Sequence, residues 1–110
     1  MRVSKERPGL STVSSFELKR TADGVFDLIG EMSFETAAQI LKASEREFVQ
    51  HAETQVNLSQ VSKADSAGLA LLLEWKAQAK SRNTVIRYVA LPESLLAVAR
   101  TTEVTDLILD

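Results

Sequence analysis

Residues 57–80, NLSQVSKADSAGLALLLEWKAQAK, contain the most informative pattern in this chain of 110 residues. A polar connection, residues 59–65, leads into a strongly apolar segment, residues 66–80. The hydroxyl of Ser66 stands where an N-cap side chain accepts a hydrogen bond from the unpaired backbone N–H groups of a helix's first turn, a contribution of ~1 kcal/mol. We therefore predict a helix over residues 66–80 with Ser66 as its N-cap.

The same serine also suits a phosphate group. The N-terminal end of a helix carries a partial positive charge, which would stabilise a phosphate on Ser66. The carboxylate of Asp65 opposes a second negative charge beside it, unless an approaching enzyme uses that carboxylate. The residues alone leave both roles of Ser66 open, a helix N-cap and a phosphoacceptor.

The predicted helix has two apolar faces, and a helix on the surface of a sheet buries only one of them internally. A second protein would cover the other face, and tryptophan is enriched among the residues that dominate such contacts. We therefore expect Leu71 and Trp75 at an interface; the alternative is that Trp75 packs under the N-terminal segment or a third helix. The inner face is predicted to contain Leu69, Leu72, Leu73 and Ala79, and the outer face Ala67, Leu71, Trp75 and Gln78.

Strands and helices alternate on both sides of this segment. Upstream, a turn at residues 22–24 separates two alternating segments, which predicts a β-hairpin. The resulting order, β-β-α-β-α-β-α-β, predicts an α/β fold with a partly parallel, mixed sheet. Further strands are expected at residues 54–58, 84–89 and 107–109, and further helices from an N-cap at Ser33, with Phe34, Ala37, Ala38, Leu41 and Phe48 buried, and from Pro92, with Leu95, Leu96 and Ala99 buried.

One domain over residues 15–110 accounts for all these elements, since a single core is common for ~100–150 residues. Residues 1–14 are polar and without periodicity, so we expect a flexible N-terminal tail. No apolar run approaches the ~20 residues of a membrane span, and the N-terminus lacks the apolar stretch of a signal peptide. We expect a small intracellular protein.

The residue types provide little for catalysis. The 13 Lys and Arg residues are balanced by 15 Asp and Glu residues and are not clustered, which argues against a nucleic-acid surface. The absence of Cys excludes a disulfide, a zinc–cysteine cluster and a thiol nucleophile. His51 is the one histidine and is expected in a solvated connection or at a helix end. We expect no catalytic residue, no metal site and no cofactor, and therefore no enzyme.

The run Asp65-Ser66-Ala67-Gly68-Leu69, at the entrance to the predicted helix, matches the Asp-Ser/Thr-x-Gly-Leu pattern of STAS domains. Gly30-Glu31-Met32 is similar to the Gly-Glu-Leu turn of the same family. Together with the order of elements over residues 15–110, these motifs make the sequence resemble a STAS domain. The resemblance implies a mixed β-sheet with helices packed mainly on one face.

Two branches of that family differ in function. In anti-sigma-factor antagonists the residue at Ser66 would be phosphorylated by a partner kinase, which blocks partner switching. An Asp usually follows the Gly-Glu-Leu turn in that branch, whereas this chain has Ser33. Residues 58–73, above all the block Gly-Leu-Ala-Leu-Leu-Leu, are more similar to the small STAS subunit of Mla-type ABC transporters, which move phospholipid between the membranes of Gram-negative bacteria.

The resemblance to the transporter branch implies a regulatory or assembly subunit that binds the ABC transporter ATPase and, through it, an inner-membrane permease. Its expected location is cytoplasmic and peripheral to the inner membrane, and its expected role is phospholipid transport that maintains outer-membrane lipid asymmetry. An exposed apolar helix would also allow self-association when the partner is absent. The partner-binding residues implied by the resemblance are Asp65, Ser66, Leu71, Glu74 and Trp75.

Overall fold

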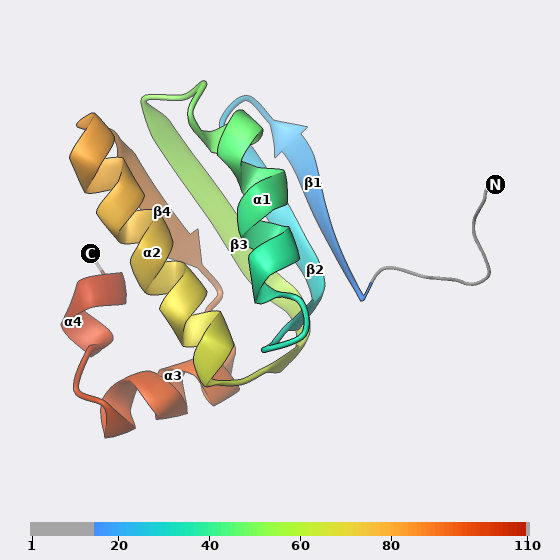
Figure 1. Ribbon diagram of the computed structural model, residues 1–110, viewed down its shortest axis with the longest axis vertical. Helices are drawn as coiled ribbons and strands as arrows, with labels where there is room; N and C mark the ends of the chain where they lie inside the picture. The colour runs from blue at the N-terminus through green and yellow to red at the C-terminus, as the bar shows by residue number, and fades with distance from the viewer. Residues whose placement is uncertain (1–14, 110) are drawn as a thin grey trace, which may run out of the picture.

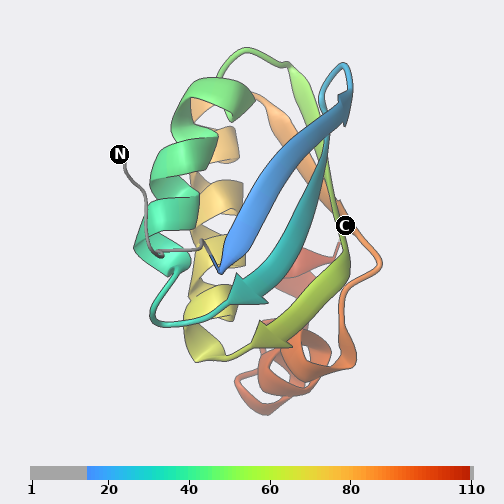
Figure 2. The same ribbon diagram turned by 90° about the vertical axis from the view of Figure 1, so that its right-hand side faces the viewer.

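The computed structural model describes residues 15–109, which form one four-stranded sheet with helices packed on one of its faces (Figure 1, Figure 2). Helices α1 and α2 lie side by side across that face, and α3 lies at the end where α2 begins. The predicted tail, residues 1–14, falls outside the described residues. The elements are β1 (Phe16–Ala22), β2 (Val25–Met32), α1 (Ala37–Phe48), β3 (Glu53–Ala64), α2 (Ser66–Arg82), β4 (Val85–Val89), α3 (Glu93–Thr101) and α4 (Thr105–Ile108).

The sheet is mixed, which confirms the predicted α/β class. β1 and β2 pair antiparallel through a tight turn at Gly24, whose φ of +73° is readily adopted by glycine. The β2–β3 and β3–β4 pairs are parallel, with α1 and α2 as the crossover helices. The strand order β1-β2-β3-β4 leaves β1 and β4 as the two edges.

Strand β3 is longer than the predicted strand at residues 54–58. Its second half, which we expected to be a polar connection, continues the pairing with β2 as far as Met32 and Ala64. Polar residues are tolerated there because Ser59, Gln60, Ser62 and Lys63 are exposed. As a result, β2 and β3 end at the same level of the sheet.

The core lies between the sheet and the two large helices. The strand side chains that face α1 and α2 are almost completely buried, and the apolar positions of both helices close over them. Each of these residues is at most 8% exposed: Phe26, Leu28, Val56, Leu58 and Ile86 from the strands, and Ile40, Phe48, Leu69, Leu72 and Trp75 from the helices.

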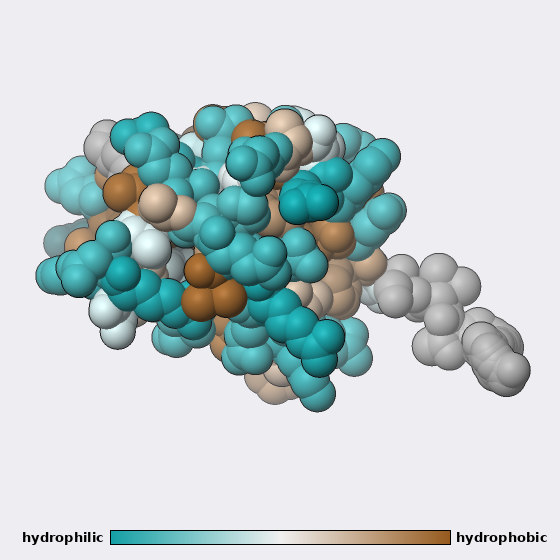
Figure 3. Space-filling model, turned by 90° about the horizontal axis from the view of Figure 1, so that it is seen from above, coloured by the Kyte–Doolittle hydropathy of each residue, from teal (hydrophilic) through white to brown (hydrophobic). Residues whose placement is uncertain are grey.

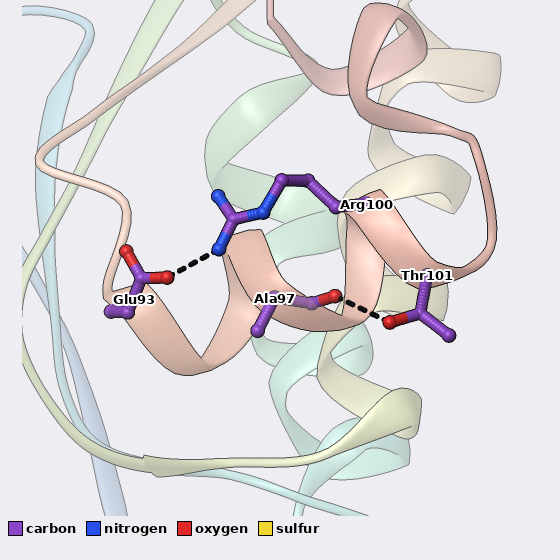
Figure 4. Close-up of polar contacts among 4 residues, drawn as sticks. All are labelled: Glu93, Ala97, Arg100 and Thr101. Atoms are coloured by element: carbon purple, nitrogen blue, oxygen red, sulfur yellow. Dashed lines mark hydrogen bonds and ion pairs between the residues drawn. The ribbon is translucent and has the colours of Figure 1, made fainter.

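Helix α3 begins after Pro92, as predicted, and buries Leu95 and Ala99. Glu93 in its first turn and Arg100 in its last turn form an ion pair on the helix surface (Figure 4). The Oγ1 of Thr101 donates a hydrogen bond to a backbone carbonyl one turn earlier. The acidic residue at the start and the basic residue at the end both complement the helix dipole.

The predicted strand at residues 107–109 is wrong, because Leu107 and Ile108 belong to the helical turn α4 and Leu109 directly follows it. The backbone N–H of Leu109 donates to the carbonyl of Thr105 at 3.0 Å, and the turn buries Ile108 while the apolar residues on either side of it stay exposed. A single helical turn and a short strand give the same alternation over three residues. Periodicity over so short a run cannot distinguish them.

Candidate protein-interaction site at the start of helix α2

Two loops meet at the end of the sheet nearest α3 (Figure 1). Met32 and Ala64 are the last paired residues of β2 and β3. Directly after them, the backbone N–H of Asp65 donates to the carbonyl of Met32 at 3.3 Å. The β2–α1 turn, residues 33–36, therefore lies beside the first turn of α2.

Asp65 joins these two loops. Its Oδ1 accepts a hydrogen bond from the backbone N–H of Ala67 at 2.9 Å, and its Oδ2 accepts one from the backbone N–H of Phe34 at 3.2 Å. Its backbone is extended (φ −134°, ψ −166°), as is typical of an N-cap residue. The Asp65 carboxylate thus caps α2 and also holds the neighbouring turn in place.

The predicted N-cap role of Ser66 is wrong, because Asp65 occupies the cap position. Ser66 is the first residue of α2 itself, and its side chain is exposed. A hydroxyl at this position is open to a partner or a modifying enzyme, and it lies at the positive end of the helix dipole. The role of Ser66 as a phosphoacceptor stays a prediction.

The hydrogen bonds to Asp65 favour its ionised form. The backbone N–H of Phe34 is the largest cause that lowers the pKa of Asp65 below its ordinary value of 3.8. Partial burial opposes this shift, while the N–H groups of Ala67 and Gly68 and the charge of Lys63 also lower the pKa. The folded protein therefore binds the Asp65 proton more weakly than the unfolded chain does.

Replacing Asp65 by alanine is expected to lower the free energy of unfolding at pH 7 by about 1–2 kcal/mol, because the helix cap and the contact with the turn are both lost. Since folding depresses the pKa of Asp65, its stabilising charge is present above pH 3.8 and is lost as the pH falls through the folded value. The difference in unfolding free energy between wild type and Asp65→Ala, measured with urea, should therefore be smaller at pH 3 than at pH 7.

The matched control is Asp65→Asn, which keeps one oxygen to cap α2 but removes the charge and the second oxygen, the one that accepts from Phe34. Its deficit at pH 7 should be smaller than that of Asp65→Ala. Equal stability of wild type and Asp65→Ala at pH 7 would contradict the capping role.

Leu71 and Trp75 do not form an exposed face, so their predicted place at a partner interface is wrong. They are 4% and 1% exposed. The indole Nε1 of Trp75 donates to the Oγ of Ser44 in α1 at 2.8 Å, and the indole lies 5.1 Å from the ring of Phe48. Trp75 on the second apolar face of α2 therefore packs inside the domain, against α1 and against Tyr88 of β4.

The exposed residues of α2 lie on a different side of the helix from Leu71 and Trp75. Ser66, Ala70, Glu74 and Ala77 are exposed at intervals of three or four residues, so they share one outward face. The carboxylate of Glu74 accepts a hydrogen bond from the Gln78 amide at 3.2 Å. Of the five predicted contact residues, the structure places Ser66 and Glu74 on this outer face and Asp65, partly exposed, at its N-terminal end.

The β2–α1 turn contains a feature that we did not predict. The N-cap of α1 is Thr36 rather than the predicted Ser33, so Phe34 lies in the turn before the helix and is 83% exposed instead of buried. Ser33 is buried, and its backbone N–H donates to the Thr36 hydroxyl at 2.9 Å. Thr36, a second residue of N-cap type, was the signal that the helix begins later.

The described residues offer little for metal or acid–base chemistry. No three or more His, Cys, Asp or Glu side chains among residues 15–109 come together as a metal site. His51 Nδ1 lies 3.6 Å from Asp23, and its ring contacts Phe26 edge-on. This contact places His51 with the β1–β2 hairpin, away from the start of α2. None of the helices formed by the described residues has the length and apolar character needed to cross a membrane.

Residues 17–109 match the family model described as "Mlab, STAS domain". The protein is therefore a STAS domain, as the motif around Ser66 implied. Within the STAS domains it belongs to the Mlab family. STAS domains are typically non-catalytic regulatory or binding modules.

The fold is similar to that of solved anti-sigma-factor antagonists. The unphosphorylated form of SpoIIAA is 16% identical with a TM-score of 0.66, covering 86% of each chain. Its phosphorylated form from Bacillus is 16% identical with a TM-score of 0.63, covering 86% of this chain and 89% of that one. A putative anti-sigma factor antagonist from Thermotoga maritima is 21% identical with a TM-score of 0.69, covering 86% and 83%. No curated protein matches the sequence.

Proposed function

We propose that this STAS domain is a non-enzymatic subunit that binds the ATPase of an ABC transporter for phospholipids at the cytoplasmic side of the inner membrane. The observation that carries the proposal is the match of residues 17–109 to the Mlab family. The binding surface is the outer face of α2, with Ser66 and Glu74 exposed on it and Asp65 at its start. Through the ATPase the subunit contacts the permease and supports assembly and activity of the transporter.

In this proposal Leu71 and Trp75 act indirectly, because both side chains are buried. They fix α2 against the rest of the domain and so hold its outer face in one orientation. With these two residues buried, the argument for self-association through an exposed apolar helix no longer applies.

The proposal is tested by affinity purification of the tagged chain from detergent-solubilised cells, followed by mass spectrometry. We expect an ABC ATPase together with its permease. A tagged, unrelated cytoplasmic domain is the control for non-specific capture. Recovery of a kinase-like anti-sigma factor without membrane proteins would contradict the transporter function.

The second candidate is a partner-switching anti-sigma-factor antagonist that is switched off by phosphorylation. The observation that favours it is the exposed hydroxyl of Ser66 at the first position of α2, in a fold shared with SpoIIAA. This candidate expects one phosphate per chain when a cognate kinase and nucleotide are supplied.

Intact-mass spectrometry measures that phosphate, and Ser66→Ala is the matched control that should abolish it. Under the transporter proposal we expect no stoichiometric modification of Ser66 by such a kinase. A stoichiometric phosphate that is lost in Ser66→Ala would favour the antagonist over the transporter subunit.

A further inference from the structure

The most exposed large apolar side chain of the described residues lies at the proposed binding site. Phe34 is 83% exposed, and its backbone N–H is held by the Asp65 carboxylate that also caps α2. Exposing an aromatic ring to water forfeits the ~1.5–3 kcal/mol that its burial would contribute. The fold itself therefore gains nothing from the position of this ring.

Hydrogen bonds hold the backbone on both sides of Phe34. The Thr36 hydroxyl accepts from the N–H of Ser33 at 2.9 Å and donates to the carbonyl of Glu31 at 2.8 Å. The N–H of Ala37 donates to the carbonyl of Ser33 at 2.9 Å. An aromatic side chain on a preorganised turn loses little conformational entropy on binding, which is a property of residues that dominate protein interfaces.

The charges next to Phe34 are mostly negative. The buried Ser33 hydroxyl contacts the carboxylates of both Glu31 and Glu35, although it has only one hydrogen to donate. Asp65 adds a third carboxylate, and among the described residues the charge of Lys63 acts on it. Two carboxylates that compete for one hydrogen leave acceptor capacity that an Arg or Lys side chain of a partner would fill.

From these observations we propose that Phe34 is the anchor of the interface and inserts into an apolar pocket of the ATPase that is bordered by Arg or Lys side chains. This inference rests on the proposed function, since the ATPase is its partner. The anchor and the outer face of α2 then form one continuous surface, because Asp65 bonds to both loops.

The opposite end of the molecule provides the matched control. Viewed from above, that end is largely hydrophilic, with apolar side chains scattered between polar ones (Figure 3). Val49, which directly follows α1 at that end, is also exposed, at 52%, and lies more than three helical turns from the start of α1. Val49→Ala removes exposed apolar surface as Phe34→Ala does, but away from the proposed anchor.

The test measures binding of the full chain to the purified, detergent-solubilised ATPase–permease complex. Phe34→Ala should weaken the Kd by at least about 30-fold, the effect expected of an interface hot spot. Val49→Ala should bind as wild type. Both variants should keep the circular dichroism spectrum and unfolding midpoint of wild type, because both side chains are exposed.

The charge of the partner is tested with Glu35→Lys, which should weaken binding and reduce the dependence of the association rate on salt. Unchanged or tighter binding of Glu35→Lys would contradict the proposal that Arg or Lys side chains border the pocket. If Phe34→Ala binds as tightly as wild type, Phe34 is not the anchor of the interface, but the proposed function is not contradicted. If the wild-type chain does not bind the transporter at all, the proposed function fails, and this inference fails with it.

Discussion

Trp75→Arg is expected to unfold the domain. The indole is 1% exposed, donates a hydrogen bond to Ser44, and packs against Phe48 and Tyr88. Removing a large buried aromatic side chain costs about 3–5 kcal/mol, and a guanidinium in the same place adds the cost of a buried charge. That sum is a large part of the ~5–15 kcal/mol that stabilises a small domain.

Circular dichroism and urea unfolding measure this effect, and the neighbouring residue gives the control. Glu74→Arg introduces the same side chain at an exposed position and should change the stability by less than about 0.5 kcal/mol. Trp75→Phe, which keeps an aromatic ring but removes the hydrogen bond to Ser44, should fall between the two. A folded Trp75→Arg variant with wild-type stability would show that the indole lies on the surface.

The second large effect is expected for Gly68→Ala, which should destabilise the domain by about 1–3 kcal/mol. A Cβ at this position would lie 2.7 Å from the carbonyl oxygen of Met32. The first turn of α2 passes so close to the end of β2 that one of the two backbones must move. The glycine at the fourth position of the Asp-Ser-Ala-Gly-Leu motif is thus explained by packing rather than by turn conformation.

Helix propensity alone predicts the opposite sign, because alanine is favoured over glycine in a helix by ~1 kcal/mol. Ala70→Gly, at an exposed position of the same helix, measures that propensity term by itself. Urea unfolding of both variants separates packing from propensity. An increase in stability for Gly68→Ala would mean that α2 and β2 are further apart than the structure shows.

Much of the fold could be predicted from the sequence because its elements have strong local patterns. Turn residues around Gly24 predict the hairpin, the apolar segment at residues 66–80 predicts α2, and the β-branched and aromatic residues around Tyr88 predict β4. The second half of β3 was missed because its polar side chains face solvent and its extended shape comes from pairing with β2. Pairing between strands that are far apart in the sequence cannot be recognised from the residues of a short segment.

The sequence predicts that the site lies at the start of α2, but it does not predict correctly which residues are exposed there. The Asp65-Ser66 pair located the start of α2, although the sequence did not show which of the two side chains caps it. The sequence does not reveal that Trp75 is buried, because the partner of its indole, Ser44, lies 31 residues earlier in the chain. The burial predicted for Phe34 is wrong because the N-cap of α1 is Thr36, three residues after Ser33. Both errors arise from contacts between α1, α2 and the turn, which periodicity within one helix does not contain.

The central claim, that the outer face of α2 binds an ABC ATPase, is tested most directly by site-specific photocrosslinking in living cells. A photoreactive amino acid replaces Ala70, which is exposed on the outer face, or Arg82, which is exposed at the far end of α2. We expect a covalent adduct with the ATPase from position 70 and none from position 82. An adduct with the ATPase from position 82 alone, or an adduct from position 70 with a kinase-like protein instead, would contradict the account.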